Sequence, residues 1–199
     1  MYTIKNLHQL VSSYMQKNRL FMACSLFLTL FFSSAPYLVN AEQRESSVLF
    51  SLINERLSHM EDVALYKHER NIKIEDLDRE QIVINSALET ATEKGLDSTS
   101  IEVFFRTQIE IAKSIQYKYF ADWARKPTNI IAPDLQTDIR PSLTQLGNSI
   151  IIEIGDLLRD SKEIKPEQRS LFHASLTIAK VDLKDKDALF DSLLLIKTQ

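Results

Sequence analysis

Residues that interrupt helices or form covalent links are scarce in this sequence. It contains 3 glycines, 5 prolines and 1 cysteine among 199 residues. A single cysteine cannot form a disulfide within the chain. No strong turn dipeptide stands between two segments of alternating apolar residues, the pattern that marks a β-hairpin. These absences exclude a disulfide-stapled or hairpin-rich fold and favour long helices.

Acidic residues are absent from the first 41 positions, and this region predicts a secretory signal peptide. A basic segment precedes the apolar run Leu20–Phe32, which is followed by Pro36 and by a cleavage site formed by Val39 and Ala41. The run of 13 residues is shorter than the about 20 that a membrane span needs. We therefore favour cleavage after Ala41 over an uncleaved membrane anchor, and expect a periplasmic or secreted protein. The basic residues are Lys5, Lys17 and Arg19.

Cleavage would leave residues 42–199, a length typical of one domain. The removed segment carries three basic residues and no acidic residue, so the formal net charge changes from −3 to −6. An acidic domain without basic runs is poorly suited to nucleic acid or to an anionic membrane surface. We expect neither as a partner.

Apolar residues recur at steps of three and four along this domain, which is the period of amphipathic helices. The pattern predicts a single all-α domain of about six helices, with three in residues 42–126 and three after a loop in 127–199. Asp76 is expected to cap the second helix and Gly95 to end it. The expected helical ranges are 46–69, 76–95, 97–123, 141–159, 166–180 and 185–196.

Arg56 and Lys67 are two cations on one face of the first predicted helix. They are 11 residues apart, which is about 20° beyond three full turns and about 16.5 Å along the axis. Met60 and Val63 lie between them, so this face is the buried one. The two side chains either extend from the edge of the face into water or converge on one anionic ligand.

The start of the second predicted helix is rich in charge. Asp76 and Glu80 suit the positive end of the helix dipole, but the cation Arg79 opposes it. Arg79 is therefore either solvated or engaged with a ligand. Gln116 on the third helix and Arg140 before Pro141 are polar residues for which a solvated surface position is the plain alternative.

Motifs for covalent or metal-assisted catalysis are missing from the sequence. His59 and His68 are nine residues apart and face opposite sides of a helix. There is no phosphate-binding glycine loop, nucleophile elbow or H-E-x-x-H motif. We therefore expect no metal site and no cofactor.

Six ordered sequence blocks resemble the helical chorismate mutases, in particular their secreted, periplasmic subclass. The resemblance is close over residues 49–123 and weaker as far as Arg140. The blocks are Glu55-Arg56-Leu57, Val63-Ala64-x-Tyr66-Lys67, Ile74-Glu75-Asp76-x-x-Arg79-Glu80, Gly95-Leu96-Asp97, Phe104-Phe105-x-x-Gln108-Ile109-Glu110, and Lys113-x-Ile115-Gln116-Tyr117 continuing to Ala121-Asp122-Trp123.

The resemblance implies a [3,3] rearrangement of chorismate to prephenate, which needs no nucleophile, metal or cofactor. Arg56 and Arg140 would hold one substrate carboxylate, and Arg79 would contact the substrate or its other carboxylate. Lys67 and Gln116 would donate hydrogen bonds to the ether oxygen as its negative charge grows.

The resemblance also assigns the substrate hydroxyl to Glu80 and to the backbone of Asp76. The sequence departs from the family at Ala112, where a hydroxyl residue is common, so we expect a modest loss of affinity. By the same resemblance we expect a homodimer.

Two other functional classes stay open at this point. One is a catalytically weak chorismate-binding domain or pseudoenzyme, and the other is a structural helical bundle with surface cations. Two uses of an exported enzyme also stay open: phenylalanine synthesis outside the cytoplasm and action on a host's chorismate.

Overall fold

The computed structural model describes residues 35–160 and 162–199, with side chains from Ser46 onward. The apolar run of the predicted signal peptide therefore lies outside the described residues. The predicted cleavage point after Ala41 falls within the first described helix, α2 (Ala35–Ser58). Residues Gln43–Gln199 form one compact unit, to which the following description refers. Among the described helices, none combines the length and the apolar character that crossing a bilayer requires.

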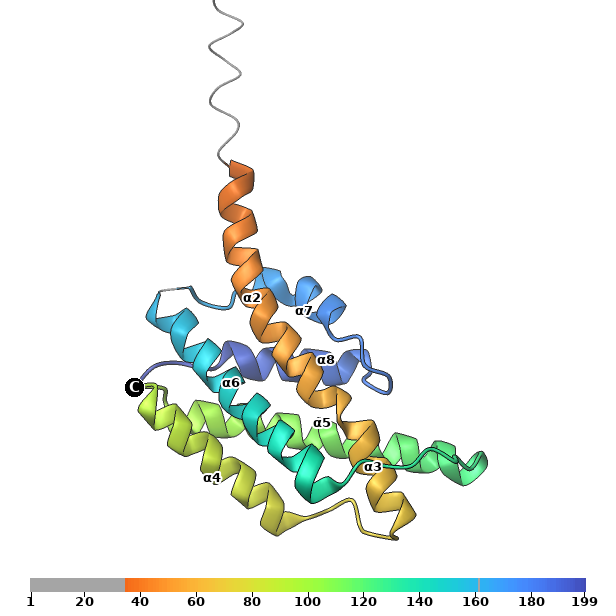
Figure 1. Ribbon diagram of the computed structural model, residues 1–199. Coiled ribbons are helices and arrows are strands. Elements are labelled where there is room, and N and C mark those ends of the chain that lie inside the picture. The colour runs from red at the N-terminus through yellow and green to blue at the C-terminus, as the bar shows by residue number, and fades with distance from the viewer. Residues whose placement is uncertain (1–34, 161) are drawn as a thin grey trace, which may run out of the picture. The chain divides into compact units, whose positions relative to one another are not determined.

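The described part of the chain is built from helices, as predicted, and all six expected helical segments are present (Figure 1). The all-α prediction is confirmed. A π-helical turn and a 3-10 turn precede α6 and α7, at Leu135–Ile139 and Pro166–Gln168. The helices are α2 (Ala35–Ser58), α3 (Met60–Glu69), α4 (Leu77–Glu93), α5 (Ser98–Arg125), α6 (Arg140–Arg159), α7 (Arg169–Ser175) and α8 (Leu183–Leu194).

The first predicted helix differs from the expectation because it is divided at His59 into α2 and α3. The hydroxyl of Ser58 donates to the carbonyl of Glu55 at 2.6 Å, which competes with the regular backbone pattern at this point. The interruption is slight, because His59 keeps helical backbone angles and its carbonyl still accepts from the Val63 amide.

The fifth predicted helix is shorter than expected, since α7 ends at Ser175 and not near Lys180. The backbone groups that would continue the helix instead form hydrogen bonds with residues far away in the sequence. The Thr177 amide donates to the side chain of Asn54 at 2.9 Å. Lys186 of α8 donates to the carbonyls of His173 and Leu176 at 2.8 and 2.6 Å. These tertiary partners satisfy groups that helical hydrogen bonds would otherwise have satisfied.

Short side chains fix the beginnings and ends of the helices that carry the predicted site. Asp76 caps α4 by accepting from the Arg79 amide at 3.1 Å, as predicted. Gly95 follows α4 with φ of +70°, a conformation that glycine adopts without steric cost. Asp97 then caps α5 by accepting from the Ser100 amide at 2.9 Å. Asp134 starts the π-helical turn that shortens the predicted loop before α6.

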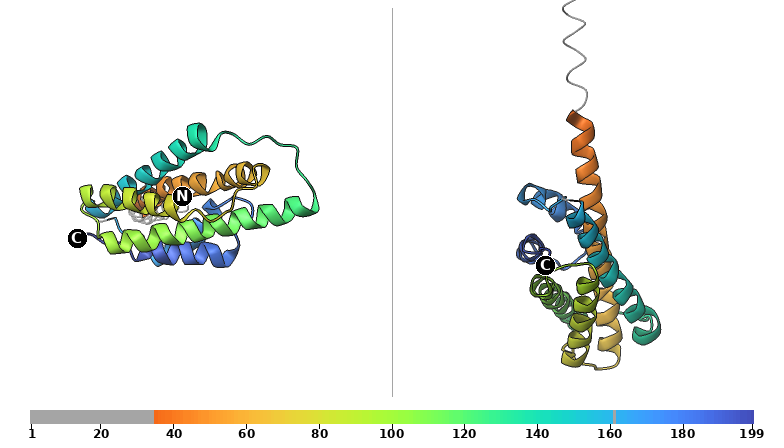
Figure 2. Two further views of the ribbon diagram at one scale, coloured as in Figure 1. Left: turned by 90° about the horizontal axis from the view of Figure 1, so that it is seen from below. Right: turned by 90° about the vertical axis from the view of Figure 1, so that its left-hand side faces the viewer.

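Helix α5 is central to the compact unit. It packs against α3 and α4 on one side and α8 on the other (Figures 1 and 2). Its buried face carries Phe104, Phe105, Ile111 and Ile115, which are at most 4% exposed. Helix α5 is 28 residues long and packed from both sides. It supplies one wall of the cavity described below.

The C-terminal tail is attached to the corner between α4 and α5. The amide of Asp97 donates to the carbonyl of Lys197 at 2.9 Å, and the amide of Gln199 donates to the carbonyl of Gly95 at 3.0 Å. The side chain of Gln199 also donates to the carbonyl of Leu96 at 3.1 Å. The tail therefore fixes the turn from which α5 begins.

Candidate active site

A cavity of about 260 Å³ lies among the end of α2, the helices α3, α4, α5 and α6, and the connector between α3 and α4. Its wall combines apolar side chains such as Val63 and Ile109 with a group of charged ones. The structure places every site residue predicted from the sequence on this wall. These residues are Arg56, Lys67, Asp76, Arg79, Glu80, Ala112, Gln116 and Arg140.

Arg56 is buried in the wall of the cavity and does not extend into water, since it is 5% exposed. Its guanidinium carbon lies 5.9 Å from the ring centroid of Phe105, and its Nε has no hydrogen-bond partner among the described residues. Gly147 of α6 lies beside it, at a distance where a Cβ would make ordinary van der Waals contact with the Arg56 Nε at 3.9 Å. Burial, followed by repulsion from Arg79, lowers the pKa of Arg56 to about 10.

Lys67 is buried at the end of α3 and is 6% exposed. Its Nζ donates to the carbonyl of Ile74 at 2.5 Å, which fixes the ammonium beside the cavity. An ammonium has three donors, so this bond leaves donors for a ligand. Burial is the largest influence and lowers the pKa of Lys67, with the nearby Asp76 carboxylate opposing it.

Arg79 and Arg140 are two cations at the same wall with different partners. Arg140 forms an ion pair with Asp76 at 3.0 Å and also donates to Gln136 at 2.9 Å. Arg79 forms no ion pair among the described residues, and its Nη2 donates to the Thr144 hydroxyl at a long 3.4 Å. Burial and the charge of Arg140 lower the pKa of Arg79. Arg79 is therefore the less satisfied cation of the two.

Glu80 presents its two carboxylate oxygens to different surroundings. Oε2 accepts from Lys113 Nζ at 3.4 Å. Oε1 is buried and has no partner among the described residues. A buried acceptor without a donor is costly to leave unpaired, so this oxygen is a position where a ligand hydroxyl would be stabilised.

Gln116 has a side-chain amide held in one orientation. Its Nε2 donates to the carbonyl of Ala112 at 3.0 Å and lies 3.8 Å from the Met60 sulfur. Its Oε1 has no partner within the described part of the chain. Because an amide nitrogen carries two hydrogens, the bond to Ala112 leaves one hydrogen, whose neighbour is the weakly accepting sulfur. Ala112 itself contributes a methyl group to the wall.

The charge balance of the cavity decides which ligands it suits. Seven charged side chains line it, of which five are cationic and two are acidic. Like charges that line one cavity repel each other and raise the free energy of the charged forms. A ligand with two negative charges would relieve this repulsion. The cations are Arg56, Lys67, Arg79, Lys113 and Arg140, and the acids are Asp76 and Glu80.

The sequence of this chain is similar to those of known proteins. Residues 47–117 match the sequence family described as chorismate mutase type II. A protein of Yersinia pestis named secreted chorismate mutase is 35% identical over 179 residues, which are 90% of this chain and 91% of that protein. The chain belongs to the chorismate mutase type II family. A protein of Enterobacter agglomerans named monofunctional chorismate mutase is 32% identical, over 87% of this chain and 95% of the relative.

Solved chorismate mutase structures share the fold. The crystal structure of the secreted chorismate mutase from Yersinia pestis superimposes with a TM-score of 0.70, over 76% of this chain and 97% of that one, at 35% identity. The chorismate mutase from Burkholderia thailandensis gives a TM-score of 0.61 at 31% identity, over 75% of this chain and 96% of the other. The protein is thus a chorismate mutase, an isomerase of all-α fold.

Polar residues that sequence reasoning did not assign to the site of this mutase also line its cavity. Lys113 is three residues before Gln116, and Thr144 and Asn148 follow Arg140 at steps of four. Helical spacing from a predicted site residue would have found all three, since such residues share one face.

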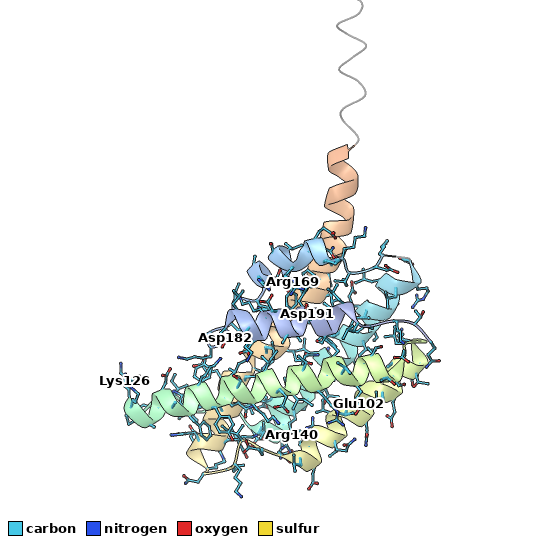
Figure 3. All side chains as sticks on the ribbon, turned by 180° about the vertical axis from the view of Figure 1, so that it is seen from behind. Glu102, Lys126, Arg140, Arg169, Asp182 and Asp191 are labelled. Carbon is cyan, nitrogen blue, oxygen red and sulfur yellow. The ribbon has the colours of Figure 1, made fainter. Side chains whose placement is uncertain are left out.

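The C-terminal helices α7 and α8 contribute nothing to the cavity wall within the described residues. Figure 3 shows Arg169 and Asp191 of these helices on one side of α5 and Arg140 on the other. From the predicted segment 127–199, the lining residues come from Leu135 to Ile151.

Proposed function

We propose that the cavity binds chorismate as a dianion and holds it in the compact conformer that rearranges to prephenate. The observation that carries this proposal is the convergence of five cations and two carboxylates on one cavity of about 260 Å³. A concerted rearrangement needs an oriented substrate and stabilisation of the charge that develops at the ether oxygen. The wall offers groups for both tasks.

The arginines would bind charge that the substrate already carries. Arg56 and Arg140 would hold one carboxylate, and Arg79 would contact the substrate or its other carboxylate. Arg140 would exchange part of its pairing with Asp76 for a substrate carboxylate. Guanidinium groups suit carboxylates because their donors match the two oxygens. Such contacts are present in the ground state and serve mainly binding and orientation.

Lys67 and Gln116 would stabilise charge that appears during the reaction. Both donate to backbone carbonyls in the structure, at 2.5 and 3.0 Å. Lys67 retains further donor hydrogens, and Gln116 retains one, whose neighbour is the weakly accepting Met60 sulfur. A hydrogen bond to the ether oxygen strengthens as the oxygen gains charge, so it lowers the activation barrier. Glu80 would accept the substrate hydroxyl through its unpartnered Oε1, assisted by the backbone of Asp76.

The proposed function is tested by following the loss of chorismate absorbance with purified protein. Turnover to prephenate without added metal or cofactor is the expected result. Binding of chorismate without turnover would instead support the pseudoenzyme alternative. If the protein neither bound nor converted chorismate, the results would support the third alternative, a structural helical bundle.

We further propose that the protein is exported and forms a homodimer. Export is supported by the N-terminal sequence and by the name of the Yersinia pestis relative. Apolar side chains exposed on the adjacent helices α4 and α6, among them Leu77 and Ile152, suit a dimer surface. Activity confined to the cytoplasmic fraction would contradict export, and a monomer mass in light scattering would contradict the dimer.

The amide of Gln116 predicts activity that changes little with pH from about 5 to 8, because an amide donates in the same form throughout this range. The Gln116→Glu variant must be protonated to donate, so its kcat/KM should fall about tenfold per pH unit above the carboxyl pKa. Measuring both proteins at constant ionic strength tests this. A steep loss in the wild-type protein between these pH values would contradict the role of Gln116.

Basic pH should limit activity through Lys67. The protonated ammonium is the active form, and burial lowers the pKa of Lys67 below its ordinary 10.5. The alkaline loss of activity is therefore expected to begin at a lower pH than an exposed lysine would give.

The Ala112→Ser substitution should tighten substrate binding. Ala112 lines the cavity and is 7% exposed, so the new hydroxyl would face the ligand. A hydrogen bond of ordinary strength would lower KM by about twofold to tenfold. Steady-state kinetics measure this effect. Ala121→Ser, at an exposed position of the same helix outside the cavity wall, is the matched control, and equal KM values for all three proteins would contradict the prediction.

A further inference from the structure

Lys113 is a cavity-lining cation for which the reaction as described above has no task. It follows Ala112 on α5, and its side chain is 17% exposed. Its Nζ lies 2.8 Å from Oε1 of Glu110 on the same helix and 3.4 Å from Oε2 of Glu80 on α4. The lysine therefore connects an acid at the surface with an acid at the cavity.

The orientation of the Glu80 carboxylate depends on its partners. The last torsion of a glutamate side chain is broad and close to two-fold, so the side chain alone does not determine which oxygen faces the cavity. In the structure, Oε2 accepts from Lys113, whereas Oε1 is buried and has no partner among the described residues. Holding one oxygen with a cation leaves the other without a protein partner, which a ligand hydroxyl at the cavity could supply.

Glu110 holds Lys113 from the outside. Its side chain is 70% exposed, and it pairs with Lys113 across one helical turn. The hydrogen bond to Glu110, opposed by partial burial and supported by Glu80, raises the pKa of Lys113. The lysine is therefore charged at neutral pH and is confined between two carboxylates.

We propose that Lys113 is a positioning residue that fixes the Glu80 carboxylate so that Oε1 accepts the substrate hydroxyl. The inference rests on the role of Glu80 in the proposed function. Lys113 acts through Glu80, and its contribution is to substrate binding and conformer selection. It is not a donor to the ether oxygen, which Lys67 and Gln116 serve.

The first test is Lys113→Met, which removes the charge and keeps an unbranched side chain. Loss of an oriented, charge-assisted contact predicts an increase of KM by about fivefold to twentyfold, with kcat changed less than about threefold. Lys113→Arg keeps the cation and should restore most of the affinity. Lys184→Met, an exposed lysine on α8 away from the cavity, controls for the loss of one positive charge. Unchanged KM in Lys113→Met would overturn the inference.

The second test is a double-mutant cycle with Glu80→Gln. If Lys113 acts through Glu80, then Lys113→Met should have almost no further effect on KM in the Glu80→Gln background. Additive effects would show that Lys113 binds the substrate by itself, and the inference would be wrong. If Glu80→Gln alone left KM and kcat unchanged, the role of Glu80 would fail instead, so the two failures are distinguishable.

Discussion

Replacing Lys67 by methionine should lower kcat by about 10²- to 10³-fold, which is the usual cost of removing one donor that stabilises developing negative charge. Lys67 is 6% exposed, and its ammonium is fixed by the Ile74 carbonyl at 2.5 Å, so it needs little rearrangement when charge appears. A cation in such a dry position interacts more strongly than one in water. KM should change much less than kcat, because the ground-state ether oxygen carries little charge.

Lys73→Met is the matched control for this experiment. Lys73 is an exposed lysine in the connector between α3 and α4 and is absent from the cavity wall. The Lys73→Met substitution removes the same charge six residues further along the chain and should leave kcat unchanged. Thermal unfolding of both variants shows whether the unpaired Ile74 carbonyl affects stability. A Lys67→Met protein with kcat within about threefold of wild type would remove Lys67 from the transition-state role.

Arg79→Ala should lower kcat/KM by about 10²- to 10³-fold, as expected for the loss of two charge-assisted hydrogen bonds to a carboxylate. The same substitution should not lower Tm. In the ligand-free protein, Arg79 is repelled by Arg140 and in turn lowers the pKa of Arg56, and its contact with Thr144 is long. Removing it relieves repulsion, so loss of activity and retained stability are expected together.

Arg106→Ala provides the comparison, because Arg106 is an exposed arginine of α5 paired with Glu102 at the surface. It should change neither kcat/KM nor Tm appreciably, since exposed pairs contribute little. Differential scanning fluorimetry and steady-state kinetics on the same samples measure both quantities. A marked fall of Tm in Arg79→Ala would mean that the arginine stabilises the fold, and the low activity could then not be assigned to a lost substrate contact.

Local features of the sequence were sufficient to predict much of the helical structure. Asp76 and Gly95 mark the two ends of α4 through interactions within a few residues. The spacing of Arg56 and Lys67 placed them on the apolar face of the first helix, but it left open whether their side chains reach water, and the structure shows both buried. Such predictions succeed because each depends on neighbours along the chain.

Features that depend on distant segments could not be predicted in the same way. Arg140 pairs with Asp76 across 64 positions, and Lys113 reaches Glu80 across 33. The early end of α7 depends on Asn54, which is 123 positions away from Thr177. The spacing of residues along one helix contains no information on these contacts, since they arise when separate helices pack. The resemblance to the family predicted Arg140 as a site residue, but it did not predict the ion pair of Arg140 with Asp76.

The attachment of the C-terminal tail to the turn before α5 bears on when the enzyme can form. Gln199 and Leu96 are 103 positions apart, so this contact closes a corner whose two sides lie far apart in the sequence. Long-range closures of this kind come late in folding because the intervening chain must first lose conformational freedom. Until then the α4–α5 corner remains open to water. A chain that has not yet made this closure therefore lacks part of the support of α5, the helix that carries Gln116 of the cavity wall.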